Sequence, residues 1–175
     1  MQNKQVRWIV QTALFIALLV VIQFATASLG NTLITGSLVN LILIISVLSC
    51  GLQTGAFVAI LSPILAKLVG IGPLWTIIPF VMLGNLVLVI IYKLVYDKVE
   101  KNIVGQIILI VGAALVKTLV LYLGIVKIMV PLVLQLPAKQ ATIISTMFSF
   151  PQFITATIGG VIALIVFSQL KKTLK

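Results

Sequence analysis

Long apolar runs, separated by short polar or glycine-rich stretches, make up nearly the whole chain. About 20 apolar residues in helical form span the roughly 30 Å hydrocarbon core of a bilayer. The pattern therefore predicts an all-α integral membrane protein, with six transmembrane helices forming one domain over residues 1–175. The expected spans are 8–25, 38–50, 55–69, 74–96, 103–130 and 141–170.

Glycine, proline and polar residues mark the expected breaks between spans. Residues 26–37 are rich in Gly, Thr, Ser and Asn, and they are expected to form a loop after the first span. Gly72-Pro73 ends the third span. Pro151 removes a backbone hydrogen bond and is expected to bend the sixth span.

Composition supports the membrane interpretation. With 62% hydrophobic and 8% charged residues, the chain has too little polar surface to cover a soluble domain. The formal net charge of +10 could indicate nucleic acid, but the basic residues flank apolar runs. Membrane orientation explains them better, so we expect a multi-pass protein of the cell membrane that binds no nucleic acid.

The basic residues also predict which side of the membrane the termini occupy. Six spans place both termini on one side, together with the turn at 51–55 and the loop at 97–102. That side carries eight of the twelve basic residues: Lys4, Arg7, Lys93, Lys98, Lys101, Lys171, Lys172 and Lys175. Because cytoplasmic loops carry an excess of Lys and Arg, both termini are expected in the cytoplasm.

The first span has an alternative interpretation as a secretory signal. Lys4 and Arg7 precede an apolar run that ends at Ala25-Thr26-Ala27, which resembles a cleavage site. The run is longer than a usual signal core. Its loss would also move one terminus away from the side of its basic neighbours, so we expect the span to be retained.

The chain offers few groups for chemistry. It has two acidic residues, Asp97 and Glu100, no His, and one cysteine, Cys50. No cluster inside the apolar segments can hold a metal, relay a proton or activate a nucleophile. We expect no catalytic residue, no metal site and no cofactor. A membrane enzyme would have to use the two acidic residues near the interface.

Lys117 lies inside an apolar span without an acidic neighbour in the sequence. Counted from Ile103, it is about 21 Å along the helix. A charge at that depth costs roughly 2.5–3.5 kcal/mol on insertion scales and normally faces a cavity or a partner. We hypothesise that an anionic ligand, for instance a carboxylate, pairs with it. Alternatively, Lys117 extends to the outer interface, as is expected for Lys67.

Several further polar side chains are candidates for substrate binding. They are Asn31, Thr35, Ser37, Asn40, Trp75, Asn85 and Gln152. The first four have an alternative role in a solvated loop that caps the second helix. Asn85 has one in helix–helix hydrogen bonding, and Trp75 has one as an interfacial anchor.

Small residues at four-residue spacing indicate where membrane helices approach closely. Ala13 and Ala17 form such a pair in the first span. Ser62, Ala66 and Gly70 continue the spacing in the third span, where internal packing is the better explanation.

Taken together, these features resemble the substrate-binding (S) component of energy-coupling-factor (ECF) transporters, the vitamin-uptake relatives of ABC importers. The resemblance rests on Thr12–Ala17 opening the first of six spans, the polar first loop, Gly84-Asn85, and Pro151-Gln152. It implies that Ala13 and Ala17 dock a membrane scaffold subunit. It also implies two ATPase subunits as partners and a substrate pocket near the external side.

The resemblance predicts a subunit that captures a small water-soluble vitamin or related micronutrient. Family substrates include riboflavin, thiamine, biotin, folate, pantothenate, niacin, cobalamin and queuosine precursors, and no signature in the chain selects one. The unpaired Lys117 favours a carboxylate-bearing vitamin. A structural or assembly protein and a stand-alone carrier are the alternative functions.

Overall fold

The computed structural model describes residues 3–173, and helices are the only regular secondary structure in that range. Five of its helical stretches are long and apolar enough to cross a membrane, and α3 is a shorter apolar helix. The predicted all-α membrane fold with six passes is confirmed. Lys175, part of the predicted basic tail, lies outside the described residues. The elements are α1 Lys4–Ala27, α2 Thr32–Cys50, α3 Leu52–Leu68, η1 Trp75–Ile77, α4 Ile78–Val99, α5 Ile103–Leu121, the π-helical η2 Tyr122–Leu134, α6 Ala138–Met147 and α7 Phe150–Thr173.

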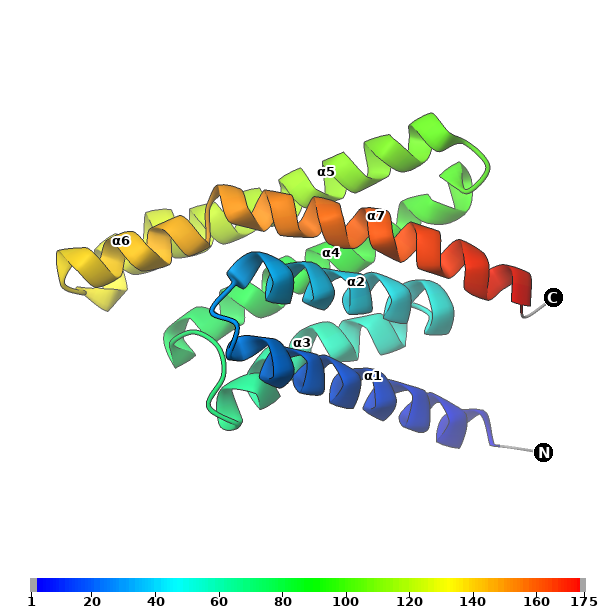
Figure 1. The fold of residues 1–175 in the computed structure, drawn as a ribbon, viewed down its shortest axis with the longest axis horizontal. Helices are drawn as coiled ribbons and strands as arrows, with labels where there is room; N and C mark the ends of the chain where they lie inside the picture. The colour runs from blue at the N-terminus through cyan, green and yellow to red at the C-terminus, as the bar shows by residue number, and fades with distance from the viewer. Residues whose placement is uncertain (1–2, 174–175) are drawn as a thin grey trace.

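The six passes run up and down side by side (Figure 1). The two ends of the chain, the α2–α3 turn and the α4–α5 connection lie at one end of the molecule, which we call the basic end. The α1–α2 connection, η1 and the η2–α6 connection lie at the other end, the outer end. The arrangement gathers at one end the segments whose basic residues predict a cytoplasmic location.

α2 begins at Thr32, six residues earlier than the sequence pattern suggests. Asn31 is its N-cap, and its Oδ1 accepts hydrogen bonds from the backbone N–H groups of Leu33 (3.0 Å) and Ile34 (3.4 Å). Such a cap satisfies N–H groups that have no partner within the helix. Half of the expected loop at 26–37 is therefore the first part of α2.

The sixth pass is broken rather than bent. α6 ends at Met147 and α7 begins at Phe150. Pro151 has no N–H to donate to the Met147 carbonyl four residues earlier. The Gln152 side chain supplies the missing donor, with Nε2 3.0 Å from that carbonyl oxygen.

α2 lies at the centre of the bundle and packs against α1, α3, α4 and α7. All its residues from Ile42 to Val47 are buried. By contrast, α1 buries only Thr12, Leu19 and Thr26 over its described length, so most of its surface is left for lipid or a partner. The Thr12 and Thr54 hydroxyls, 3.2 Å apart, join α1 to α3.

Two glycines set how closely the helices approach around the middle of the molecule. A Cβ added at Gly159 of α7 would lie 2.6 Å from Asn40 Cβ and 2.7 Å from the Ser37 carbonyl oxygen of α2. A Cβ at Gly84 of α4 would lie 2.8 Å from a methyl group of Leu121 on α5. The α2–α7 and α4–α5 contacts therefore depend on residues without side chains.

Gly159→Ala is expected to destabilise the protein, because the added methyl group meets backbone atoms that cannot rotate away. Overpacking of this kind costs about 1–3 kcal/mol. A thermal-unfolding series in detergent measures it, with Gly112→Ala as control, since a Cβ at Gly112 meets no atom within 4 Å. Equal melting temperatures for the two variants would contradict the tight α2–α7 contact.

Candidate functional site

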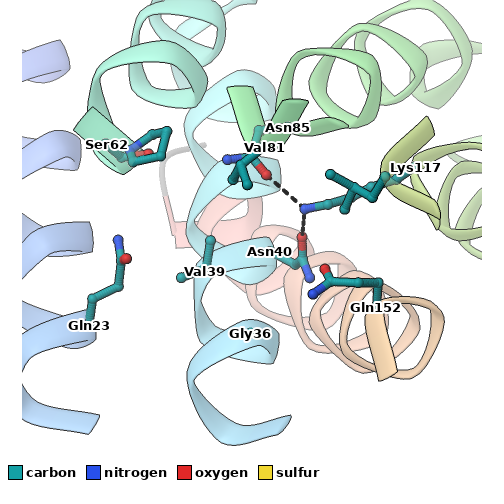
Figure 2. A pocket seen from close by; sticks show the side chains of 11 residues that line it. Gln23, Gly36, Val39, Asn40, Ser62, Val81, Asn85, Lys117 and Gln152 are labelled. Atoms are coloured by element: carbon teal, nitrogen blue, oxygen red, sulfur yellow. Dashed lines mark hydrogen bonds between the residues drawn. The ribbon is translucent and has the colours of Figure 1, made fainter. Parts of the chain in front are cut away.

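Lys117 is buried, with its side chain pointing between three helices. Its exposed fraction is 3%, and Nζ donates to Asn40 Oδ1 of α2 at 2.6 Å and to Asn85 Oδ1 of α4 at 2.8 Å (Figure 2). The ammonium group therefore does not reach the outer interface. The alternative interpretation, in which the Lys117 side chain extends to that interface, is wrong. The partners of Lys117 are Asn40 and Asn85. The sequence analysis named both as candidates but did not connect them with Lys117.

These three side chains line a cavity of about 140 Å³, which we call the central cavity. Asn40 lies eight residues into α2 and Asn85 seven residues into α4, so both are roughly 10–12 Å from the outer ends of their helices. The cavity is thus nearer the outer end than the basic end. Its lining residues are Gln23, Gly36, Val39, Asn40, Ser62, Pro63, Val81, Asn85, Lys117, Leu121 and Gln152.

A hydrogen-bond chain fixes the orientation of the Asn40 amide. Asn40 Nδ2 donates to Thr155 Oγ1 of α7 at 3.3 Å, and that hydroxyl donates to the Gln152 carbonyl oxygen at 3.1 Å. With its NH₂ group directed to α7, Asn40 presents its oxygen to Lys117. A satisfied buried network of this kind holds its members in one arrangement.

The chain provides no negative charge for Lys117. Its only two acidic residues, Asp97 and Glu100, lie at the basic end, where they pair with Lys93 and Lys171. The amide oxygens of Asn40 and Asn85 replace part of the hydration shell of the ammonium group without neutralising it. An ammonium has three N–H donors, and within residues 3–173 two acceptors are present for them.

Two further residues of the cavity were missed by the sequence analysis. Ser62 of α3 is 1% exposed, and its hydroxyl finds no hydrogen-bond partner among the described residues. Gln23 of α1 lines the cavity beside it, and Figure 2 shows both across the cavity from Lys117. Ser62 fitted the small-residue spacing of α3, which concealed its polar role. The available signal was Pro63, because a proline inside a helix removes a backbone hydrogen bond, and Pro63 lines the cavity next to Ser62.

A second hollow adjoins the central cavity on the side of the outer end. This outer hollow, of about 270 Å³, shares Gln23 and Gly36 with the central cavity. The candidate residues Asn31 and Thr35 line it, together with Gly72 from the α3–η1 connection. Thr35 is also hydrogen-bonded to Thr26 at 2.8 Å. The α1–α2 and α3–η1 connections thus line a hollow next to the central cavity.

The remaining candidate residues lie in different surroundings. Gln152 lines the central cavity, although its Nε2 atom is bonded to the Met147 carbonyl. Ser37 and Trp75 do not line the central cavity. Ser37 is buried on α2 where Gly159 approaches, and Trp75 is 52% exposed on η1 at the outer end.

Ala13 and Ala17 are exposed on α1, away from the central cavity. They line an apolar hollow of about 460 Å³ between α1 and the end of α3, called the α1–α3 hollow here. Its other lining residues are Ile16, Val20, Leu65, Leu68 and Val69. Side chains larger than alanine would fill this hollow.

Comparison with protein families matches residues 7–170 to the ECF transporter, substrate-specific component. The chain belongs to this family. The resemblance seen in the sequence is therefore confirmed, and the match includes most of the first helix. The S component is a multi-pass protein of the cell membrane and the substrate-binding subunit of a transporter, and the family implies association with an ECF scaffold and ATPase subunits. Comparison with curated proteins gave no match, and comparison with solved structures gave none.

Proposed function

We propose that this S component captures a small, carboxylate-bearing micronutrient from outside the cell in the central cavity. The observation that carries the proposal is the buried Lys117, which lines the central cavity and donates hydrogen bonds to two neutral amide oxygens. Both acidic residues of the chain lie at the basic end, where they pair with other lysines. A buried ammonium that lacks a counter-charge is costly. A ligand carboxylate would supply both the charge and a hydrogen-bond acceptor.

The sizes of the two hollows support a specific pose. About 140 Å³ is close to the roughly 150 Å³ of an engineered protein cavity that binds benzene. The central cavity therefore has room for the carboxylate end of a ligand, up to about the size of one ring. A larger ligand would extend past Gln23 and Gly36 into the outer hollow.

The first experiment identifies the ligand. Small molecules carried through purification are released by denaturation and measured by mass spectrometry, and each candidate is then tested by thermal shift and calorimetry. A carboxylate that raises the melting temperature at micromolar concentration supports the proposal, because a ligand that binds only the folded state stabilises it. Binding only of cationic or uncharged vitamins would contradict it.

We also propose that uptake requires the scaffold docked at Ala13 and Ala17 and two ATPase subunits. The exposed α1–α3 hollow supports this assignment, because small residues let membrane helices pack closely. Uptake by the S component alone in liposomes, at the rate of the full complex, would favour a stand-alone carrier. Stable assembly without any ligand would favour a structural role.

Ser62→Ala is expected to weaken ligand binding by about fivefold while leaving the empty protein at least as stable. The buried hydroxyl has no partner within residues 3–173, so a ligand group can supply one, and a hydrogen bond contributes about 1 kcal/mol net. Ser46→Ala is the matched control, since the Ser46 hydroxyl is already bonded to the Leu43 carbonyl at 2.7 Å. Equal affinities of wild type and Ser62→Ala would remove Ser62 from the ligand contacts.

A further inference from the structure

Another polar hollow lies at the basic end, at the opposite end of the molecule from the outer hollow. This basic hollow has a volume of about 320 Å³ and lies where α4, α5 and α7 meet. Three lysines line it, Lys101 from the α4–α5 connection and Lys171 and Lys172 from the last turn of α7. One carboxylate, Glu100, lines it as well.

The walls of the basic hollow are held together by contacts between the three helices. Lys171 forms an ion pair with Glu100 at 2.5 Å, which joins α7 to the end of α4. Gln106 Nε2 of α5 donates to the Glu100 carbonyl oxygen. The Tyr96 ring packs edge-on against Phe167 at 5.6 Å between ring centres. These contacts hold α4, α5 and α7 together around the hollow.

The charges in the basic hollow are unequal. Lys171 balances Glu100, whereas Lys101 and Lys172 are exposed and form no ion pair with any residue in 3–173. Leu164 lies seven residues before Lys171 on α7, about 10 Å deeper towards the apolar middle. The hollow thus combines two ammonium groups that have no ion-pair partner within residues 3–173 with an apolar side chain deeper in the bundle.

We propose that the basic hollow binds the phosphate group of an anionic membrane lipid. The ends of membrane-spanning helices lie at the level of the lipid headgroups, and basic pockets between such helices bind phosphate-bearing headgroups on the cytoplasmic side. Lys101 and Lys172 contact the phosphate, and the glycerol and upper acyl chain lie along Leu164 and Tyr96. The site is separate from the central cavity and does not rest on the proposed substrate.

Native mass spectrometry of the purified S component tests this proposal, with phosphatidylglycerol and phosphatidylethanolamine added in equal amounts. The variant is Lys101→Gln/Lys172→Gln. The control is Lys4→Gln/Lys98→Gln, which removes the same charge from exposed lysines outside the hollow. We expect phosphatidylglycerol affinity to fall by about 20- to 30-fold in the variant, at about a factor of five per lysine, and to be unchanged in the control.

Inorganic phosphate is added in a parallel series to distinguish a lipid from a soluble anion. Protection from unfolding by millimolar phosphate without selective phosphatidylglycerol retention would overturn the lipid assignment in favour of a free phosphate anion. Equal retention of the two lipids by the wild-type protein, a measurement that does not depend on whether a variant folds, would also overturn the site. So would equal losses in the two double variants. Loss of scaffold assembly in Lys101→Gln/Lys172→Gln with unchanged lipid retention would assign the lysines to a protein contact instead.

Discussion

Lys117→Met is expected to reduce ligand affinity by at least about 30-fold, the largest effect of any single substitution in the central cavity. Removing one partner of a buried, hydrogen-bonded charge pair costs about 2–5 kcal/mol of binding free energy, and 1.4 kcal/mol is a factor of ten in affinity. The empty protein should lose no stability. The methionine leaves two amide oxygens without a donor, but it also removes a buried charge. Calorimetry with the identified ligand and thermal unfolding of the empty protein measure the two effects.

Two further variants separate charge from other causes. Lys117→Gln keeps a hydrogen-bond donor without the charge and should lose affinity nearly as much as Lys117→Met. Lys127→Met removes an exposed lysine of η2 outside the central cavity and should bind normally. Wild-type affinity in Lys117→Gln would show that Lys117 acts as a donor to a neutral group, and the carboxylate proposal would fail.

Ala13→Leu/Ala17→Leu is expected to abolish uptake by the complete transporter while ligand binding by the isolated S component stays within about twofold of wild type. Leucines at these positions fill the α1–α3 hollow and prevent a scaffold helix from approaching closely. Both side chains are exposed and distant from Lys117, so the central cavity should not change. Co-purification with the scaffold and uptake of labelled ligand in cells measure the effect.

The control for this pair is Gly112→Leu on α5. Figure 1 places α5 and α1 on opposite sides of the bundle, and a Cβ at Gly112 meets no neighbouring atom. The control enlarges a small residue of a membrane pass without touching the α1–α3 hollow, so assembly and uptake should be retained. Normal uptake by Ala13→Leu/Ala17→Leu would show that the scaffold docks elsewhere.

The substitutions at Lys117 and at Ala13 and Ala17 affect different steps of one process. Lys117 concerns capture, and the alanine pair concerns coupling to the subunits that provide energy. A variant that binds but does not transport and a variant that assembles but does not bind would establish that the two surfaces act separately. The structure makes this separation physically reasonable, because α1 carries the alanines on its exposed side and contributes only Gln23 to the central cavity.

The sequence alone determined the membrane fold and the family of this protein. Backbone N–H and C=O groups in hydrocarbon must be paired within the segment, so an apolar run of sufficient length has to be helical. Local chemistry also located the interruption near Pro151, because proline lacks an N–H wherever it occurs. The pattern was less informative at helix starts, and the capped first turns of α2 were assigned to a loop since capping residues and loop residues have the same composition.

Only the tertiary structure decided what surrounds Lys117. Its partners Asn40 and Asn85 are 77 and 32 residues away in the chain. Gly84 lets α4 approach α5, which carries Lys117, and Gly159 lets α7 approach α2 at Asn40. Hydropathy fixes that a segment crosses the membrane, but a helix can rotate about its axis without changing that average. The side chains that face one another are therefore set by packing between helices, which no single segment of sequence contains.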